Sequence, residues 1–411
     1  MSRFSLRARW VLPVERPAIA GGTVVVSGGR IESVGDASIA EPPLYDLGDV
    51  VLMPGLVNVH THLEFSHLEQ TLGKSGMPLP DWIRLVIASR RRSDCDPKQA
   101  IRAGLEESRR NGVTTLGEIA TGTCSIVSSD EFPRQISYQE VIGFSAARID
   151  SVVGDLEHRL FEQPATVRHA SIGLSPHAPY TVHPQLLERL VDLASRQQLP
   201  MAMHLAESHE ELELLATVSG PFRELLEERS MWDGNAIPPG TQPLNYLQAL
   251  ARAPRALVVH GNYLKPVEIE YLASRRERMS VAYCPRTHAF FRHSEYPLQQ
   301  MLAAGVRVAL GTDSRASNPD LSLLEEMRYL ARRHTTLDPS QILEMGTLVG
   351  AEALGWEEQI GSLRPGKWAD LTAVACNPQS KEPVADILSG IAAPTKTWLR
   401  GRLHQPARYE N

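Results

Sequence analysis

The stretch Leu52-Met-Pro-Gly-Leu-Val-Asn-Val-His60-Thr-His62 decides the fold of this chain. It contains a short apolar run that follows a Pro-Gly pair and ends in two histidines placed two residues apart. On a β-strand, residues i and i+2 project from the same face, so both imidazoles can reach one ion. In parallel barrels, functional groups lie at the carboxyl ends of the strands, and this segment has that form.

Seven further apolar runs follow this first one, and helical patterns separate most of them. The expected strands are Leu56–Val59, Thr114–Ile119, Glu140–Phe144, Ser171–Leu174, Met201–His204, Leu257–His260, Ser280–Tyr283 and Arg307–Gly311. The helical patterns include Lys98–Arg110, Leu186–Arg196, His209–Ala216 and Ser322–Arg333. This alternation predicts an α/β fold, a (β/α)₈ TIM barrel. A doubly wound open sheet is disfavoured because no Gly-x-Gly-x-x-Gly follows the first strand.

Strand patterns also occupy both ends of the chain, outside the barrel. The expected ones are a hairpin of Thr23–Ser27 and Arg30–Val34 turned by Gly28-Gly29, then Val50–Met53, Gly361–Leu363, Asp370–Val374 and Thr395–Arg400. We expect the two ends to pair in a small composite β-sandwich. The predicted division is residues 1–54 and 356–411 for the sandwich and 55–355 for the barrel. Gly220–Gln242, rich in Pro and Gly, is expected to be an insertion on the loop side.

Composition excludes several classes of protein. The 411 residues carry 42 Lys and Arg against 48 Asp and Glu, without the basic stripe that a nucleic-acid partner requires. We find neither a signal peptide nor a membrane-length apolar run. The four cysteines are scattered, which is typical of a reduced, cytoplasmic protein rather than of a disulfide framework.

Three further predicted strands end in residues that bind metals. His204 closes the fifth strand, His260 closes the sixth, and Asp313 follows the eighth. Since the carboxyl ends of barrel strands share one rim, we expect these side chains to lie beside His60 and His62. Imidazole nitrogens together with a carboxylate suit Zn²⁺ or Fe²⁺. A single histidine at a strand end is more often structural, but several coordinated placements indicate a metal site.

With these residues on this frame, the chain resembles the amidohydrolase superfamily. The match runs over nearly the whole chain, from Met53-Pro54-Gly55 to the closing Gly361-Ser-Leu-Arg-Pro-Gly-Lys-Trp-Ala-Asp370-Leu. Within it, His204-Leu-Ala-Glu207 and Gly311-Thr-Asp-Ser-Arg-Ala-Ser-Asn318 look like one branch of that superfamily. The branch holds the S-adenosylhomocysteine deaminases, the guanine deaminases and the triazine hydrolases.

The lysines of the chain narrow the kind of metal site that the resemblance implies. Binuclear members bridge two metals with a carbamylated lysine at the end of the fourth strand. The chain has six lysines, and the predicted fourth strand contains none; Lys74 and Lys98 precede it without ending a strand. The resemblance therefore implies a mononuclear site with one divalent metal. Histidine and aspartate serve zinc and iron alike, and we favour zinc.

The resemblance also implies a role for each residue. Asp313 would accept a proton from a metal-bound water, whose pKa the metal lowers from ~15.7 towards ~7, and His260 would orient the hydroxide. Glu207 would protonate a ring nitrogen and pass a proton to the leaving group. The alternative for Glu207 is a solvent-facing carboxylate at a helix start, which the helix dipole also favours. The expected metal ligands are His60, His62, His204 and Asp313.

Residues that would contact a substrate are placed with less support from the pattern. His177, in Ser-Pro-His-Ala-Pro-Tyr, matches a substrate-contacting histidine of the related deaminases. Glu64 would accept hydrogen bonds from a ribose or an exocyclic amine, or else form a salt bridge in its loop. Arg148 would bind a carboxylate, unless it is an ordinary surface arginine. Trp82 and Phe65 would stack on a heterocycle or pack in the core.

Enzymes of this branch displace ammonia, an alkylamine or halide from an electron-poor ring carbon. Deamination is the commonest of these outcomes, so we expect hydrolytic deamination of an amino-heterocycle or nucleoside of the adenosine or aminodeoxyfutalosine kind. The loop after the first strand, His62-Leu-Glu64-Phe-Ser66 followed by Pro80–Ile87, looks similar to aminodeoxyfutalosine deaminases. A triazine-type amino- or chlorohydrolase is the alternative. A non-catalytic assembly protein of the same fold is disfavoured because every ligand position is filled. The expected partner is a small molecule, and related enzymes are often homodimers.

Overall fold

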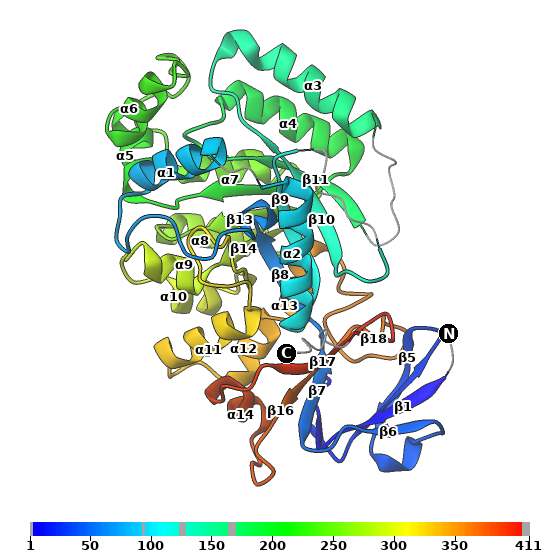
Figure 1. Ribbon diagram of the computed structural model, residues 1–411. Coiled ribbons are helices and arrows are strands. Elements are labelled where there is room, and N and C mark those ends of the chain that lie inside the picture. The colour runs from blue at the N-terminus through cyan, green and yellow to red at the C-terminus, as the bar shows by residue number, and fades with distance from the viewer. Residues whose placement is uncertain (1–2, 93–94, 123–128, 163–169, 405–411) are drawn as a thin grey trace.

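Eight parallel strands form the central sheet of the computed structural model, which describes residues 3–92, 95–122, 129–162 and 170–404. They are adjacent in chain order, and a bridge between Thr61 and Asp313 links the last strand to the first (Figure 1). The predicted (β/α)₈ barrel is thereby confirmed. The strands are β8 (Leu56–Thr61), β9 (Val113–Ala120), β10 (Arg134–Val141), β11 (Ala170–Pro176), β12 (Met201–Leu205), β13 (Ala256–His260), β14 (Met279–Tyr283) and β15 (Val308–Leu310).

The third barrel strand was predicted wrongly. β10 covers Arg134–Val141, six residues earlier than the expected start at Glu140. Its alternate residues Gln135, Ser137 and Gln139 are polar yet fully buried, so the strand does not show the apolar run by which the others were found. The apolar residues after Val141 belong instead to the loop that leaves the barrel.

Helices surround the barrel and begin at clear sequence signals. In α2, for example, Asp96 accepts a hydrogen bond from the backbone N–H of Lys98, and Pro97 takes the first helical position. The helices are α1 (Leu79–Arg92), α2 (Pro97–Arg110), α3 (Ile149–Glu162), α4 (Pro184–Gln197), α5 (His209–Thr217), α6 (Pro221–Glu228), α7 (Pro243–Leu250), α8 (Pro266–Ser274), α9 (Pro285–Phe290), α10 (Leu298–Ala303), α11 (Leu323–Arg333), α12 (Pro339–Met345), α13 (Leu348–Leu354) and α14 (Pro383–Ser389). The predicted insertion, Gly220–Gln242, contains one of these helices, α6.

The two ends of the chain form sheets that lie together below the barrel in Figure 1. A four-stranded sheet contains β1 (Phe4–Arg7), β4 (Thr23–Ser27), β5 (Arg30–Gly35) and β6 (Leu44–Asp46). A six-stranded sheet mixes both ends: β2 (Trp10–Val11), β3 (Ile19–Ala20), β7 (Val50–Pro54), β16 (Leu371–Ala375), β17 (Pro394–Leu399) and β18 (Arg402–His404). The predicted Gly28-Gly29 turn is present, with both φ angles positive. The expected strand Gly361–Leu363 is absent, because Gly361 takes a left-handed conformation in a loop.

The passage from the terminal sheet into the barrel depends on one glycine. Gly55 separates β7 from β8, and its backbone N–H donates to the carbonyl of Asp370 at 2.8 Å. A Cβ atom at this position would lie 2.1 Å from Cγ2 of Thr114. Only glycine therefore lets the first barrel strand approach β9 so closely.

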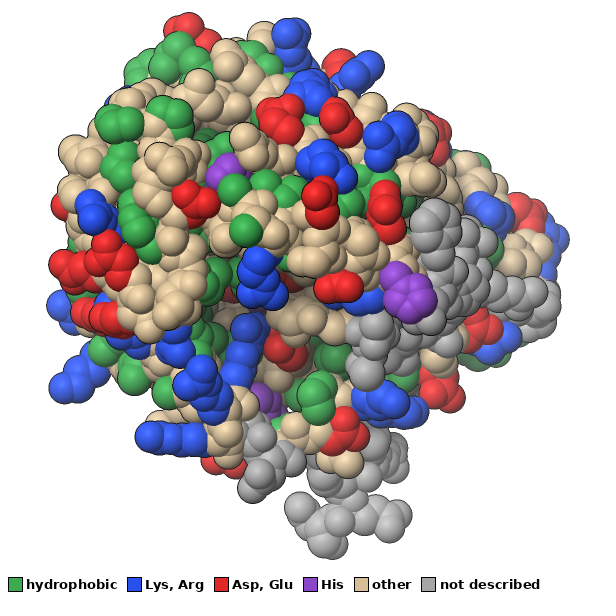
Figure 2. All heavy atoms as spheres, turned by 90° about the horizontal axis from the view of Figure 1, so that it is seen from above, with side chains coloured by type: hydrophobic (Ala, Val, Ile, Leu, Met, Phe, Trp, Pro, Cys, Tyr) green, Lys and Arg blue, Asp and Glu red, His purple; other side chains and the backbone are tan. Residues whose placement is uncertain are grey.

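The surface carries mixed charge. On the face seen from above, acidic and basic side chains alternate over the helices (Figure 2). Within the described part of the chain, no helix is long and apolar enough to cross a membrane.

Candidate metal centre and active site

Five polar residues meet at the carboxyl ends of four barrel strands, as the sequence predicts. His60 lies near the end of β8 and His62 directly follows that strand. His204 lies one residue before the end of β12, His260 ends β13 and Asp313 follows β15. The ring centroids of His60 and His204 are 5.0 Å apart. Asp313 Oδ1 lies 3.6 Å from Nε2 of His60 and 3.7 Å from Nε2 of His62.

These side chains fit a divalent metal ion. Both ring nitrogens of His60 are buried without a hydrogen-bond partner among the described residues, a state that is costly unless something else binds them. Nδ1 of His204 donates to the carbonyl of His177 at 2.9 Å, which leaves Nε2 free to coordinate. One ligand atom from each of His60, His62 and His204 lies within 4.8 Å of the others, and His60, His260 and Asp313 form a second such group. The site can hold one divalent metal.

The backbone is strained at three of the strand ends that form this site. Ala206, His260 and Asp313 have φ angles of 53°, 68° and 57°, which side chains other than glycine adopt at a cost. At Asp313 the strained turn is held by a hydrogen bond from its own N–H to the carbonyl of His60, at 3.0 Å. Strain of this kind persists where the surrounding structure fixes it, and it clusters at functional sites.

Glu207 is held beside His260 by a set of buried groups. Its Oε1 lies 3.4 Å from Nε2 of His260, and the hydroxyl of Tyr180 donates to its Oε2 at 3.3 Å. Asn262 donates to its backbone carbonyl at 2.8 Å. Burial, together with the negative charges of Asp313 and a neighbouring glutamate, raises the pKa of Glu207 well above its ordinary value. This shift favours the protonated form of Glu207 and makes it a candidate acid of the centre.

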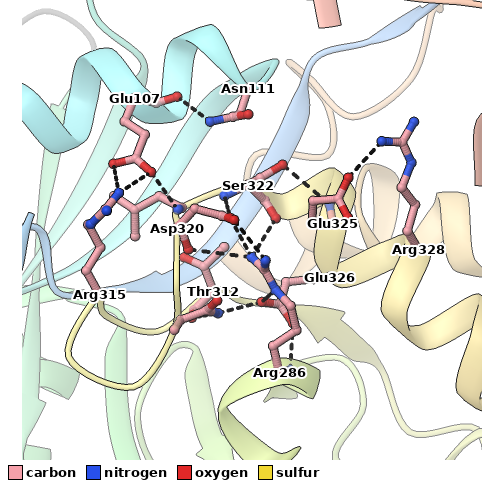
Figure 3. Close-up of polar contacts among 12 residues, drawn as sticks. Glu107, Asn111, Arg286, Thr312, Arg315, Asp320, Ser322, Glu325, Glu326 and Arg328 are labelled. Atoms are coloured by element: carbon pink, nitrogen blue, oxygen red, sulfur yellow. Dashed lines mark hydrogen bonds and ion pairs between the residues drawn. The ribbon is translucent and has the colours of Figure 1, made fainter. Parts of the chain in front are cut away.

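A network of ion pairs positions the loop that carries Asp313 (Figure 3). Arg286 donates to Asp320 at 2.7 Å and to Glu326 at 2.7 Å. Glu326 also accepts from Asn318 at 2.6 Å, and Asn318 in turn donates to the carbonyl of Thr312 at 2.7 Å. The residue before Asp313 is thus tied to α9 and α11, so the aspartate is placed by a rigid support rather than by a free loop.

A largely apolar cavity opens onto this centre. One wall comes from α1 and the residue Phe65 before it, and the facing wall comes from α6 and the loop after it. Arg84 of α1 forms an ion pair with Glu228 at the end of α6, with 2.8 Å between the closest atoms. The apolar lining residues are Phe65, Leu79, Trp82, Ile83, Val86, Ile87, Ile142, Phe222, Leu225, Leu226 and Met231.

The sequence of the chain matches that of a known enzyme family. The profile of the Amidohydrolase family matches residues 51–403, which is most of the chain. The chain belongs to the amidohydrolase family. The family and its deaminase-named relatives are those of a hydrolase that acts on C–N bonds other than peptide bonds. The predicted family is therefore confirmed.

Two proteins that are similar to this amidohydrolase are named as deaminases. A 5-methylthioadenosine/S-adenosylhomocysteine deaminase of Nitratidesulfovibrio vulgaris (strain Miyazaki F) is 33% identical over 386 residues, which cover 89% of this chain and 80% of that protein. An adenosine deaminase from Xanthomonas campestris, solved with bound zinc, has a TM-score of 0.79 and 26% identity, covering 98% and 93% of the two chains.

More distant solved structures share the fold. The aminofutalosine deaminase of Helicobacter pylori, bound to methylthio-coformycin, has a TM-score of 0.84 at 20% identity and covers 98% of this chain and all of its own. An atrazine chlorohydrolase from Arthrobacter aurescens has a TM-score of 0.81 at 18% identity and covers 99% and 97% of the two chains. At these identities the likeness concerns the fold alone.

The three predicted substrate residues of the amidohydrolase lie in different surroundings. His177 lines the cavity, its Nδ1 lies 2.6 Å from the hydroxyl of Thr181, and burial lowers its pKa to about 3. Glu64 lies beside the cavity, where it pairs with Arg90 at 2.5 Å. Arg148 is exposed on a 3₁₀ turn at 146–148 and does not line the cavity.

Among the buried carboxylates near the centre that sequence reasoning missed are Glu211 and Glu140. Glu211 accepts hydrogen bonds from the backbone N–H groups of Ala206 and Glu207. It could have been noticed as the fourth residue of Ser208-x-x-Glu211, the pattern of a capping box. Glu140 lines the cavity at the end of β10. No sequence signal marked it, because the strand that carries it was itself misplaced.

Proposed function

We propose that this amidohydrolase uses one zinc ion to deaminate a nucleoside that carries a 6-aminopurine base, such as adenosine. The proposal rests on the placement of Glu207, a buried carboxyl group with a raised pKa, beside His260 and the candidate metal ligands. Hydrolytic deamination requires such an acid, because the ring nitrogen beside the reacting carbon must gain a proton as that carbon is attacked. The deaminase from N. vulgaris, named for two purine nucleosides, supports this substrate class.

The side chains divide the work of the reaction. A zinc ion held by the predicted ligand set would supply a nucleophile from water at near-neutral pH. Asp313 accepts the proton that the attacking water loses, and His260 orients that water toward the ring carbon. Glu207 gives its proton to the ring nitrogen, takes up the proton of the hydroxyl group now on the ring carbon and passes it to the amine, which leaves as ammonia. The proton held by Asp313 then restores Glu207. The zinc found in the related adenosine deaminase supports this metal over iron. The ligand set is His60, His62, His204 and Asp313.

The cavity suits a nucleoside rather than a free small amine. Its aromatic side chains Phe65 and Trp82 offer flat surfaces to a purine ring or to an apolar substituent on the sugar. The ion pair between Arg84 and Glu228 joins the two helices that form the walls, so the bound ligand would be sheltered from water. Exclusion of water strengthens the electrostatic interactions on which the acid chemistry depends.

A panel of substrates tests this proposal. Ammonia release is measured with enzyme of known zinc content on adenosine, 5-methylthioadenosine, S-adenosylhomocysteine, aminodeoxyfutalosine, guanine and melamine. Ammonia from one or more of the nucleosides supports the proposal and identifies the substrate. Halide release from atrazine with no nucleoside turnover would contradict it and favour a triazine-type hydrolase.

Two variants control the panel. Glu207→Gln keeps the shape of the side chain but cannot supply the proton, so its nucleoside turnover should be lost. Glu270→Gln makes the same change on the exposed face of α8 and should behave as the unmodified enzyme.

A cytoplasmic location and a homodimeric assembly stay predictions from the sequence.

A further inference from the structure

Glu140 is a buried carboxylate of the cavity that the proposed reaction does not use. Its side chain is 5% exposed and lines the cavity at the end of β10. Nε2 of His177 lies 3.9 Å from its Oε1, beyond hydrogen-bonding distance. None of the described residues donates a hydrogen bond to this carboxylate. Burial raises the pKa of Glu140, as expected for an acid removed from water without a donor.

Arg90 and Glu64, the charged residues near Glu140, form an ion pair with each other. Arg90 pairs with Glu64, with 2.5 Å between Nη2 and Oε1, and the hydroxyl of Thr121 donates to the other Glu64 oxygen at 3.0 Å. Each oxygen of Glu64, the predicted acceptor for a sugar, thus already accepts one hydrogen bond, whereas Glu140 accepts none from the described residues. Glu140 is therefore the more available of the two acceptors for a ligand.

The position of Glu140 along the rim indicates which part of a ligand it meets. β10, β11 and β12 are adjacent strands, so Glu140, His177 and His204 follow one another around the rim. The rings of His177 and His204 are 5.0 Å apart. A ligand whose reacting carbon lies beside His204 thus extends past His177 toward Glu140. Its amine is then at the metal centre, and the hydrogen-bond donors that a nucleoside keeps are its sugar hydroxyls.

We infer that Glu140 receives the ribose hydroxyl groups of the substrate and makes the enzyme select ribonucleosides over their deoxy analogues. The two oxygens of a carboxylate can accept from two adjacent hydroxyls, and such charge-assisted bonds are strong where water is excluded. A buried acceptor left without a donor is costly, so a ligand that lacks the hydroxyls is rejected. This inference rests on the proposed deamination of a nucleoside.

The experiment compares adenosine with 2′,3′-dideoxyadenosine in the zinc-loaded enzyme and in Glu140→Gln. The enzyme should prefer adenosine by roughly 10- to 100-fold in kcat/KM, from the usual strength of hydrogen bonds to a charged group. In Glu140→Gln this preference should shrink to a few-fold, mostly through a higher KM for adenosine, while turnover of the dideoxy analogue changes little. Glu270→Gln should keep the full preference. The Tm of Glu140→Gln should equal or exceed that of the parent, since an unpaired buried acid is removed.

Four other results would each contradict either the role of Glu140 or the proposed function. An equal preference in the parent enzyme and in Glu140→Gln would overturn the role of Glu140 and leave the proposed deamination intact. A loss confined to S-adenosylhomocysteine, which carries an ammonium group, would assign Glu140 to that group and overturn the ribose assignment. A fall in Tm together with an equal loss on both nucleosides would show a structural role only. Absence of any nucleoside turnover by the parent would overturn the proposed function itself.

Discussion

The carboxylate of Glu211 accepts a hydrogen bond from the backbone N–H of Glu207, with 2.9 Å between nitrogen and oxygen. Its other oxygen accepts the N–H of Ala206 at 2.8 Å. One buried acid in the first turn of α5 therefore fixes the left-handed turn on which the proposed catalytic acid is mounted. Glu211 is a positioning residue, since it reaches the cavity through Glu207.

Replacement of Glu211 by glutamine should lower kcat by roughly 10- to 100-fold without loss of zinc. This range is expected when a reacting group is displaced by up to about one ångström. The amide offers one accepting oxygen, so one of the two backbone N–H groups would face the NH₂ group and the turn would shift. Steady-state kinetics and metal analysis give the two readouts. Glu213→Gln, on the exposed face of the same helix, is the matched control. An unchanged kcat in Glu211→Gln would contradict the positioning role.

The same residue should make stability depend on pH. Burial raises the pKa of Glu211 from 4.5 to about 7, so the folded protein binds this proton more tightly than the unfolded chain does. The stability that this provides is present below about pH 4.5 and is lost as the pH rises through 7, with an upper bound of roughly 3 kcal/mol. Between pH 5 and pH 8, Tm should therefore fall more in the parent enzyme than in Glu211→Gln. Parallel curves for the two proteins would refute this prediction.

Glu207→Gln should keep its metal and lose activity by ~10²–10⁴-fold, the range usual for a general acid or base. Its side-chain contacts are with His260 and Tyr180 rather than with the predicted ligands, so the metal site should be unaffected. Zinc content and kcat are measured on the same preparation. Loss of zinc in this variant would mean that Glu207 is itself a ligand or supports one.

Asp313→Asn should weaken both metal retention and turnover. Asp313 is the one carboxylate in the predicted ligand set, and an amide is a poorer ligand for zinc. Zinc remaining after dialysis against a chelator and kcat/KM in excess zinc are the measurements. Asp155→Asn, an exposed change on α3, should retain both properties. Full zinc retention by Asp313→Asn would remove Asp313 from the ligand set.

Gly55→Ala should reduce the free energy of unfolding by about 1–3 kcal/mol, the usual cost of overpacking. The added methyl group would overlap the side chain of Thr114, whose Cγ2 and Oγ1 lie 2.1 and 2.2 Å from the new atom. Thermal unfolding measures the change. The double variant Gly55→Ala with Thr114→Ala should recover part of the loss, whereas no recovery would place the strain elsewhere.

The strand ends could be predicted because their signals are local. A short apolar run that ends in His60 and His62, or in His204, identifies a buried strand and its functional end in one stretch of sequence. The strand β10 could not be found in this way, since Gln135, Ser137 and Gln139 are polar residues inside the barrel. Their burial depends on partners from neighbouring strands, which a single sequence does not show.

The supporting residues were missed for a related reason. Glu211 resembles an ordinary helix-cap residue, and only the fold shows that its carboxylate turns back to the Ala206–Glu207 turn. Glu64 and Glu140 look alike as single acids, but the pairing of Glu64 with Arg90 joins residues 26 positions apart. Charge matching between distant segments decides which of the two is available to a ligand.

The mixed six-stranded sheet has a consequence for the order in which the protein forms. β7, which leads directly into the strand of His60 and His62, pairs on one side with β2 and on the other with β16, whose residues 371–375 are made after all eight barrel strands. A nascent chain that still lacks β16 leaves that side of β7 uncovered, as an open edge that can pair wrongly. We therefore expect the start of the first barrel strand to be secured only after every barrel strand has left the ribosome.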